Sequence, residues 1–412
     1  MELGHFLLLL GIALIAARLL GEFAKALSIP SVLGELFAGV LLGPSLLNLI
    51  QPTEIWETLA EIGVILLLFE VGLESNFQQL TGTGSKPYWV AITGFISPLI
   101  LADLLTQYVF HLSLLTSFFI AGTLTATSIG ITVRVLSDLK QRHSHEAQII
   151  IGAAVLDDIL GVLLLAFVYD FAIHKTISLA TTAQTALYIV IFLIITPLIA
   201  KLLFNLLDVF DLKRDSPGLL LTLSFSLILF CSALASILGA PLILGGFAAG
   251  LAASKQFGPS LPRLGKRLNT LFRINSTLSH RIETQSKPLI HIFTPIFFVM
   301  VGVSLNLRVI PWHSALIWTL TLSLFIAAIL GKLVAGFVIK EPRLIQMRIG
   351  TSMIPRGEVG LIFAKIGLAS AALDSLEYAA LILVVSLTTF LPPFILQRLY
   401  QPAPGPESPE AG

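Results

Sequence analysis

Two adjacent carboxylates stand in the middle of an apolar run. Asp157 and Asp158 occur in Ala-Ala-Val-Leu-Asp-Asp-Ile-Leu-Gly-Val, with about two helical turns of apolar residues on each side. Burial and mutual repulsion both disfavour two charges there, so the pair can keep a proton at neutral pH. Hard oxygen ligands also suit Na+ or Li+. We therefore expect proton and cation to compete for these carboxylates, which suffices for antiport if only a loaded site changes sides; structural pairing with basic residues is the alternative.

Two segments predict interrupted helices. Residues 122–130 read Gly-Thr-Leu-Thr-Ala-Thr-Ser-Ile-Gly, and their hydroxyls compete with the backbone for hydrogen bonds. We expect the helix to unwind there and to offer oxygen ligands from Thr125, Thr127 and Ser128. Residues 353–360, Met-Ile-Pro-Arg-Gly-Glu-Val-Gly, contain a proline and two glycines that favour a second break. Two interrupted helices at equivalent positions are typical of a transport site at the membrane midplane.

Four further charged positions need partners if they lie in the membrane. Lys332 stands alone in an apolar run, and Asp157 is its natural partner. We interpret Lys332 as a second proton carrier or as a counterion that the cation displaces, with snorkelling to the surface as the alternative. For Arg356 we favour a structural charge pair, with Glu358 or with Glu70, because an always-charged guanidinium cannot carry protons.

The composition of the whole chain indicates a bilayer as its main solvent. Its 412 residues are 56% hydrophobic and 12% charged, with a mean hydropathy of +0.92, which excludes a soluble globular protein. A net charge of +1 argues against a nucleic-acid partner, and the single cysteine, Cys231, excludes disulfide scaffolds and thiolate clusters. We expect no enzymatic activity and no cofactor, only transported ions.

Apolar runs predict thirteen transmembrane helices in an all-α polytopic membrane protein. They are expected at residues 5–26, 31–50, 58–74, 88–108, 113–136, 147–171, 182–207, 217–238, 241–254, 289–306, 313–339, 347–369 and 377–398. With the N-terminus outside, twenty of the 25 Lys and Arg residues fall on the cytoplasmic side and two on the other. We therefore expect a multi-pass protein of a prokaryotic-type inner membrane, or a thylakoid membrane, with a cytoplasmic C-terminus.

Self-comparison of the sequence indicates an inverted repeat. Residues 30–39 align without gaps on residues 241–250, and residues 69–76 align on residues 299–306. The displacement is seven helices, an odd number, so the two halves are expected to cross the bilayer in opposite directions. The expected organisation is a transmembrane domain at 1–398, with repeat one at about 5–171, a linker helix at about 182–207, repeat two at about 217–398 and a basic interfacial segment at 255–287, followed by a disordered cytoplasmic tail at 399–412.

The chain resembles the monovalent cation/proton antiporter superfamily, in the branch that includes bacterial sodium/proton antiporters and glutathione-gated potassium efflux systems. The motifs that carry the resemblance are Gly34–Pro44, Leu66–Glu74, Thr125–Ser128, Leu156–Asp158 and Pro355–Gly360. The resemblance implies a homodimer in which a core domain with crossed broken helices moves against a dimerisation domain. It also implies Asp158 as the binding carboxylate, Asp157 as the preceding acid, and electrogenic exchange that involves Lys332.

Other functions remain open at this stage. A K+/H+ efflux antiporter would use the same carboxylates. An intramembrane aspartyl protease needs two facing acids from different helices, whereas consecutive aspartates such as Asp157 and Asp158 lie about 100° apart on one helix. A sensor or channel on a transporter scaffold is a third alternative.

Overall fold

The computed structural model describes residues 3–27, 29–74, 84–174, 179–214, 218–254 and 276–400, and all regular secondary structure in these ranges is helical. The α-helices are α1 (Leu3–Ala26), α2 (Ser31–Leu42), α3 (Glu54–Glu74), α5 (Lys86–Leu104), α6 (Leu114–Thr125), α7 (Ile129–Asp138), α8 (His145–His174), α9 (Leu179–Arg214), α10 (Leu219–Ile237), α11 (Leu242–Ala253), α13 (Ser276–Ser304), α14 (Ala315–Phe337), α15 (Arg343–Ser352), α16 (Glu358–Ala369) and α17 (Ser375–Tyr400). A π-helical turn, η1 (Leu105–Val109), and a 3₁₀ turn, η2 (Leu307–Val309), complete the set.

The helices follow the order of the predicted membrane spans. Nine segments of the described chain are long and apolar enough to cross a bilayer, and shorter apolar helices accompany them. Two predicted spans are each divided, one into α6 and α7 and the other into α15 and α16. With each divided pair taken as one span, the described helices follow the thirteen predicted spans in order. The prediction of an all-α polytopic membrane protein is therefore confirmed.

The start of α13 differs from the prediction. The helix begins at Ser276, not near residue 289, and it continues through two internal prolines. A proline removes one backbone hydrogen bond, but neighbouring helices in a membrane protein can satisfy the freed carbonyl. Residues 276–287 of the expected interfacial segment thus belong to the same helix as the span. Residues 255–275, like the predicted tail beyond residue 400, lie outside the described residues.

The two halves of the chain start their second helices in the same way. Pro30 precedes α2 with φ −53° and ψ 133°, and Pro241 precedes α11 with φ −57° and ψ 138°. Each proline fixes φ near its own preferred value at the point where an amide would have no helical partner. α2 then packs on α13, and α11 packs on α3, so each of these helices packs against a helix of the other half of the chain.

Glycines make the closest contacts in these two helix pairs. Gly39 of α2 lies against the backbone carbonyl of Val299 in α13, and Gly250 of α11 lies against the backbone carbonyl of Phe69 in α3. A Cβ atom at either glycine would collide with that carbonyl, so only glycine permits the approach. The sequence alignments pair Gly39 with Gly250 and Phe69 with Val299. The same contact therefore occurs twice, as a twofold relation between the halves requires.

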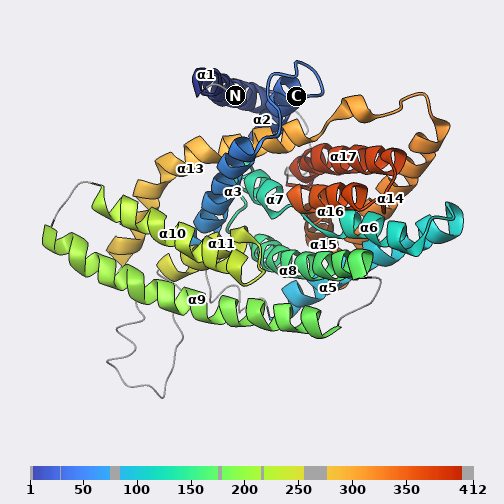
Figure 1. The fold of residues 1–412 in the computed structure, drawn as a ribbon. Helices are drawn as coiled ribbons and strands as arrows, with labels where there is room; N and C mark the ends of the chain where they lie inside the picture. Colours follow the sequence, from blue (N-terminus) through green and yellow to red (C-terminus); the bar gives the residue numbers. More distant parts are fainter. Residues whose placement is uncertain are drawn as a thin grey trace, which may run out of the picture.

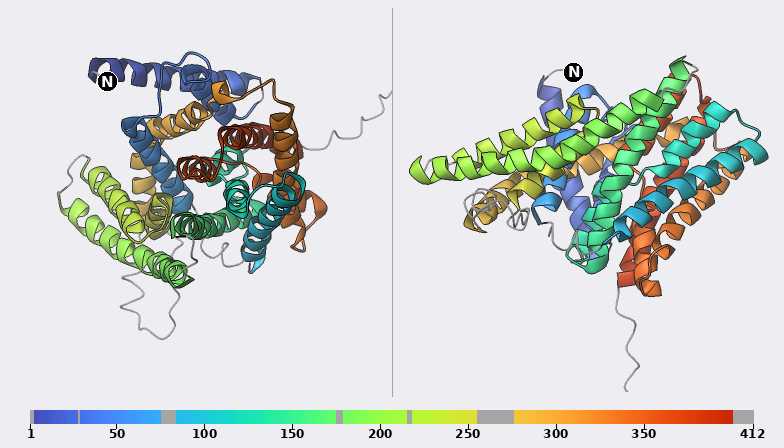
Figure 2. Two further views of the ribbon diagram at one scale, coloured as in Figure 1. Left: turned by 45° about the vertical axis from the view of Figure 1, so that its right-hand side comes forward. Right: turned by 90° about the horizontal axis from the view of Figure 1, so that it is seen from below.

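The helices form two groups that meet at α7 (Figures 1 and 2). The frame group consists of α1, α2, α3, α10, α11 and α13, which pack on one another. The site group consists of α5, α6, α8 and α14 to α17. α7 packs against α2 and α3 on the frame side and against α8 and α17 on the site side, while α9 contacts α10, α11 and α8. Relative motion of the two groups would therefore shear the surroundings of α7.

Candidate ion-binding site

The predicted break in the fifth span is present. α6 ends at Thr125 and α7 begins at Ile129, and the backbone between them is extended, with ψ of 133° at Ala126 and 98° at Ser128. The four residues from Thr125 to Ser128 are almost completely buried. Their backbone amides and carbonyls therefore need partners other than water or helical neighbours.

The twelfth span is broken at the matching place. α15 ends at Ser352 and α16 begins at Glu358, with Pro355 and Gly357 between them. Proline cannot donate a helical hydrogen bond, which explains the interruption. A Cβ atom at Gly357 would lie 2.6 Å from the Ser128 hydroxyl, so the absence of a side chain lets the two breaks approach closely.

Hydrogen bonds join the two breaks. The Ser128 amide donates to the Pro355 carbonyl at 2.8 Å, and the Thr127 hydroxyl donates to the Met353 carbonyl at 2.9 Å. Each extended segment thus satisfies backbone groups that the other leaves without a helical partner. The two discontinuous helices cross at this point and are held together by these hydrogen bonds.

Asp157 of α8 points at this crossing. The Thr127 amide donates to Asp157 Oδ2 at 2.9 Å, and Lys332 Nζ of α14 lies 3.1 Å from both Oδ1 and Oδ2. Neither charged side chain is exposed to any extent. Burial of a charge is tolerated when it is paired and hydrogen-bonded, as here. The predicted contact between Lys332 and Asp157 is present, and snorkelling of Lys332 to the surface is excluded.

The neighbouring side-chain oxygens differ in whether they already have a hydrogen-bond partner. Asp158 is 2% exposed. The Thr125 hydroxyl donates to the Gly122 carbonyl at 2.8 Å, and the Thr127 hydroxyl is bonded as described above. The Ser128 hydroxyl is buried and has no hydrogen-bond partner within the described part of the chain. Ser128 is therefore the one member of the predicted hydroxyl set whose oxygen is not already committed.

Arg356 lies at the ends of two half-helices. Its Nη1 donates to the Ala126 carbonyl at 3.2 Å and to the Met353 carbonyl at 3.4 Å, and the side chain is fully buried. These carbonyls follow the C-termini of α6 and α15, where the helix dipole is negative. A fixed positive charge there stabilises both helix ends and the crossing between them.

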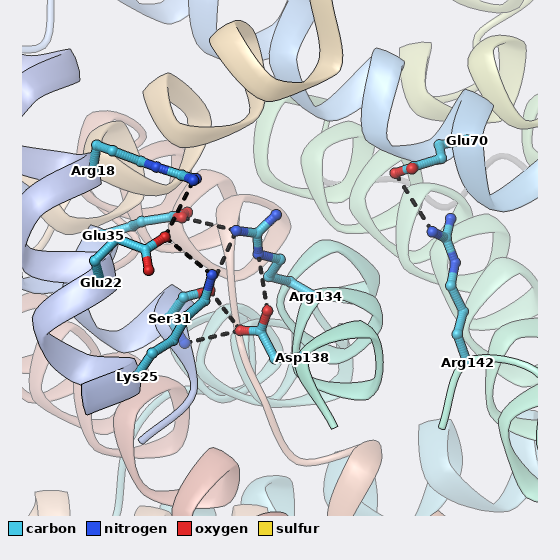
Figure 3. A network of polar contacts seen from close by, with 9 residues as sticks. All are labelled: Arg18, Glu22, Lys25, Ser31, Glu35, Glu70, Arg134, Asp138 and Arg142. Carbon is cyan, nitrogen blue, oxygen red and sulfur yellow. Dashed lines mark hydrogen bonds and ion pairs between the residues drawn. The ribbon is translucent and has the colours of Figure 1, made fainter. Parts of the chain in front are cut away.

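Glu70, one of the two expected partners of Arg356, pairs with a different arginine. Glu70 pairs with Arg142 at 3.5 Å, on the turn that follows α7 (Figure 3). Glu358 begins α16, and its side chain is outside the described part of the chain. The prediction that Glu70 meets Arg356 placed the carboxylate correctly in the third span but assigned it the wrong arginine.

Sequence analysis missed two hydroxyls that support the crossing. Thr132 donates to the Ser352 carbonyl at 2.7 Å, and Thr389 of α17 donates to the Arg356 carbonyl at 2.7 Å. Thr132 lies one turn after Ser128, so extending the hydroxyl-rich segment by a turn would have found it. Thr389 stands in an ordinary apolar helix, and no sequence pattern distinguishes it.

Within the described part of the chain, four buried ionisable side chains lie at the crossing, Asp157, Asp158, Lys332 and Arg356, each no more than 2% exposed. When all four are ionised, their charges cancel. An additional cation would leave an uncompensated positive charge in a region of low dielectric constant, which is costly. Loss of a proton from one of these residues would remove that cost.

The fold and this buried cluster of ionisable residues at a helix crossing define a multi-pass membrane transporter. Residues 9–401 match the transmembrane sodium/hydrogen exchanger family, and the chain belongs to that family. The resemblance to the monovalent cation/proton antiporters is therefore confirmed.

Relatives of known description match over nearly the whole chain. The chain is 35% identical to the high-affinity Na+/H+ antiporter NhaS3 of Synechocystis sp., over 99% of this chain and 92% of that protein. It is 31% identical to a Na+/H+ antiporter of Enterococcus hirae, over 95% and 97% of the two chains. It is also 30% identical to the Na+/H+-K+ antiporter GerN of Bacillus cereus, over 96% of each.

A solved structure has the same fold. The sodium proton antiporter MjNhaP1 of Methanocaldococcus jannaschii superposes with a TM-score of 0.68 at 19% identity, covering 97% of this chain and 99% of the other. Similarity at this level of identity supports the architecture alone. It agrees with the order of helices described above.

Proposed function

We propose that this chain exchanges protons for a monovalent cation, Na+ or Li+ in preference to K+, at Asp157 and Asp158. The observation that carries the proposal is the Asp157 carboxylate, fully buried at the helix crossing and held by Lys332 and the Thr127 amide. The relatives in Synechocystis and Enterococcus are described as Na+/H+ antiporters, which supports the same exchange here.

In the proposed cycle Asp158 is the principal carboxylate ligand of the cation. The uncommitted Ser128 hydroxyl adds a neutral oxygen, and oxygen ligands of this kind suit an alkali cation. When the cation is absent, Asp158 holds a proton in its place. The two occupants exclude each other because they use the same oxygen atoms.

Lys332 carries the second proton. Its ammonium is stable in a dry site only because Asp157 balances it. A cation shared by Asp157 and Asp158 removes that balance, so Lys332 then releases a proton. Two protons move against one monovalent cation in this scheme, and the exchange is electrogenic.

Access to the site changes when the site group moves against the frame group. We propose that the chain works as a homodimer joined through its frame group in a prokaryotic-type inner membrane or a thylakoid membrane. The N-terminus would lie outside and the C-terminus in the cytoplasm, as the distribution of Lys and Arg favours.

Potassium is the alternative substrate. The relative GerN is described as a Na+/H+-K+ antiporter, and two carboxylates do not by themselves distinguish the two ions. Selectivity would then depend on how tightly the extended segment at Ser128 closes around the ion.

Purified protein in proteoliposomes tests the proposal. A pH-sensitive dye reports proton movement when Na+, Li+ or K+ is added to vesicles with an acidic interior. We expect dequenching with Na+ or Li+ that Asp158→Asn abolishes. Asp103→Asn is the matched control, because Asp103 of α5 is bonded to Gln107 instead of lying at the crossing. Retention of the Na+ response in Asp158→Asn would show that the site is assigned wrongly.

A further inference from the structure

A second cluster of charged residues joins α7 to α2. Arg134 Nη2 lies 3.0 Å from Glu35 Oε1 and donates to the Ser31 hydroxyl at 3.2 Å (Figure 3). Asp138, one turn further along α7, accepts from the Ser31 amide at 2.8 Å and from its hydroxyl at 2.6 Å. We refer to Ser31, Glu35, Arg134 and Asp138 as the α2–α7 latch.

The charged side chains of the latch are largely shielded from water, which strengthens the interactions between them. The side chain of Glu35 is 3% exposed, and those of Arg134 and Asp138 are 19% and 15% exposed. Exposed ion pairs contribute little, whereas hydrogen-bonded charges in a partly buried setting contribute more. Asp138 also lies at the N-terminus of α2, where the helix dipole favours a negative charge.

A further ion pair ties the same end of α7 to α3. Arg142, on the turn that follows α7, lies 3.5 Å from Glu70 of α3, and the two side chains are 9% and 15% exposed. Figure 3 shows this pair beside the latch, on the other side of α7. The frame group thus holds the end of α7 at two separate points.

α7 connects these contacts to the ion-binding site. Its first residue, Ile129, follows Ser128, and its last residue is Asp138. A helix of this length transmits displacement as a rigid rod, so a shift of the crossing relative to the frame group must strain the latch. Opening of the site at this end requires the latch to break.

The opposite seam between the two groups is built differently. Cavities do not distinguish the two seams, because one of about 210 Å³ lies at the α7 end, beside Pro30 and Asp138. α16 occupies in repeat two the place that α7 has in repeat one, and it faces α3 and α13 across a cavity of about 200 Å³. The ion pair over this cavity, Lys365 to Glu57 at 3.5 Å, has side chains that are 51% and 52% exposed. The charged side chains at the α7 end are thus shielded from water, and those at the α16 end are exposed. Alternating access in transporters with inverted repeats moves one group of helices against the other, so that the two ends open in turn.

We propose that the α2–α7 latch, with the Arg142–Glu70 pair, holds the transporter closed at the α7 end, and that the conformation described here is open at the α16 end. The proposal builds on the proposed exchange at Asp157 and Asp158, because it specifies which contacts must break before the ion can leave on the second side. The latch itself can be tested without any transport measurement.

Labelling of two introduced cysteines distinguishes a change from one open end to the other from a general loosening of the protein. Cys231 is the single native cysteine, so Cys231→Ser gives a thiol-free background. Val135→Cys places a reporter at a buried position on α7, and Ser304→Cys places one in the wall of the cavity. With latch variant Glu35→Gln, we expect labelling by a small water-soluble maleimide to rise about tenfold at position 135 and to fall at position 304, since a charged hydrogen bond is lost.

Glu57→Gln, which removes the exposed pair on the other seam, is the matched control and should leave labelling at position 135 unchanged. Asp138→Asn provides a second latch variant if Glu35→Gln does not fold. Unchanged labelling at both positions in a folded latch variant would overturn the proposal, and so would a rise at both, which indicates loosening. Labelling that shifts as expected, in a protein whose parent shows no cation-driven dequenching, would instead count against the proposed function and leave the latch proposal standing.

Discussion

The ammonium of Lys332 lies 3.1 Å from both carboxylate oxygens of Asp157, and neither side chain has any exposed surface. The two residues come from α14 and α8, so the pair ties two helices of the site group together. Each charge is stable there only because the other is present. The pair therefore stabilises the protein and, in the proposed cycle, also takes part in proton exchange. The two roles can be tested separately.

Lys332→Gln should destabilise the protein because it leaves Asp157 as an unpaired buried carboxylate. Breaking a buried pair by removing one partner costs about 3–5 kcal/mol, partly relieved if the acid takes up a proton. We expect a lower thermal midpoint in detergent, measured by loss of monodisperse protein on heating. In the double variant Lys332→Gln with Asp157→Asn, much of the loss should be recovered, and additive losses would contradict the assignment.

The single variant Lys332→Gln also tests how many protons are exchanged for each cation. Without the Lys332 proton, one proton should move per cation, and exchange should no longer respond to membrane potential. The measurement compares Na+-driven dequenching with and without a potassium diffusion potential set by valinomycin. Potential-dependent exchange that survives in Lys332→Gln would assign the second proton to another group.

Gly357→Ala should disturb the crossing without altering any charge. The new Cβ atom would lie 2.6 Å from the Ser128 hydroxyl, closer than real contacts allow. Overpacking of this kind costs about 1–3 kcal/mol and would displace the hydroxyl proposed as an ion ligand. We expect a raised half-saturating Na+ concentration in the dequenching assay.

Gly161→Ala is the control for this change. Gly161 lies on α8 near the same crossing, but its Cβ atom would make only ordinary contacts, with Val359 at 3.7 Å and Ala126 at 3.9 Å. Exchange by this variant should resemble the parent. Equal defects in the two variants would mean that the site does not tolerate any added carbon, and that the Ser128 contact has no special role.

Sequence reasoning reached the helices and the breaks because both depend on local chemistry. Long apolar runs fix the spans, and the hydroxyls near Thr127 and the proline at residue 355 weaken helical hydrogen bonding at those points. The Lys332 contact with Asp157 was also predicted, since an isolated buried cation needs an acid and few acids lie within the spans.

Ion pairs between residues far apart in the sequence could not be predicted in this way. Glu70 had several arginines of equal chemical merit to choose from, and the choice of Arg142 depends on the direction in which the chain leaves α7. Glu35 is an ionisable residue in an apolar helix, a signal that was present but not used. The start of α13 was missed because a proline interrupts a helix in water more reliably than in a packed membrane protein.

Gly39→Ala and Gly250→Ala should have similar effects, because the two glycines make the same contact in the two repeats. A methyl group at either position would collide with a backbone carbonyl of the facing helix. We expect both variants to lower the thermal midpoint by a comparable amount. Gly11→Ala, with nothing within 4 Å of its Cβ position, should be neutral or slightly stabilising. A large effect at one repeat glycine and none at the other would contradict the proposed symmetry.

Glu341, on the turn between α14 and α15, should make a pH-dependent contribution to stability. Lys86 donates to its carboxylate at 2.7 Å and His145 Nε2 lies at 3.0 Å; the hydrogen bond from Lys86 is the main reason why the pKa of Glu341 lies below its ordinary value of 4.5. A lowered pKa in the folded state stabilises the protein above the unfolded pKa, and the benefit is lost as the pH falls through the folded pKa. At about pH 7, the Glu341→Gln variant should therefore have a slightly lower thermal midpoint. Its free energy of unfolding should fall by no more than about 1 kcal/mol because the site is near water. The difference between parent and variant should shrink as the pH is lowered below about 4.5, and a constant difference across that range would show that the carboxylate charge is not responsible.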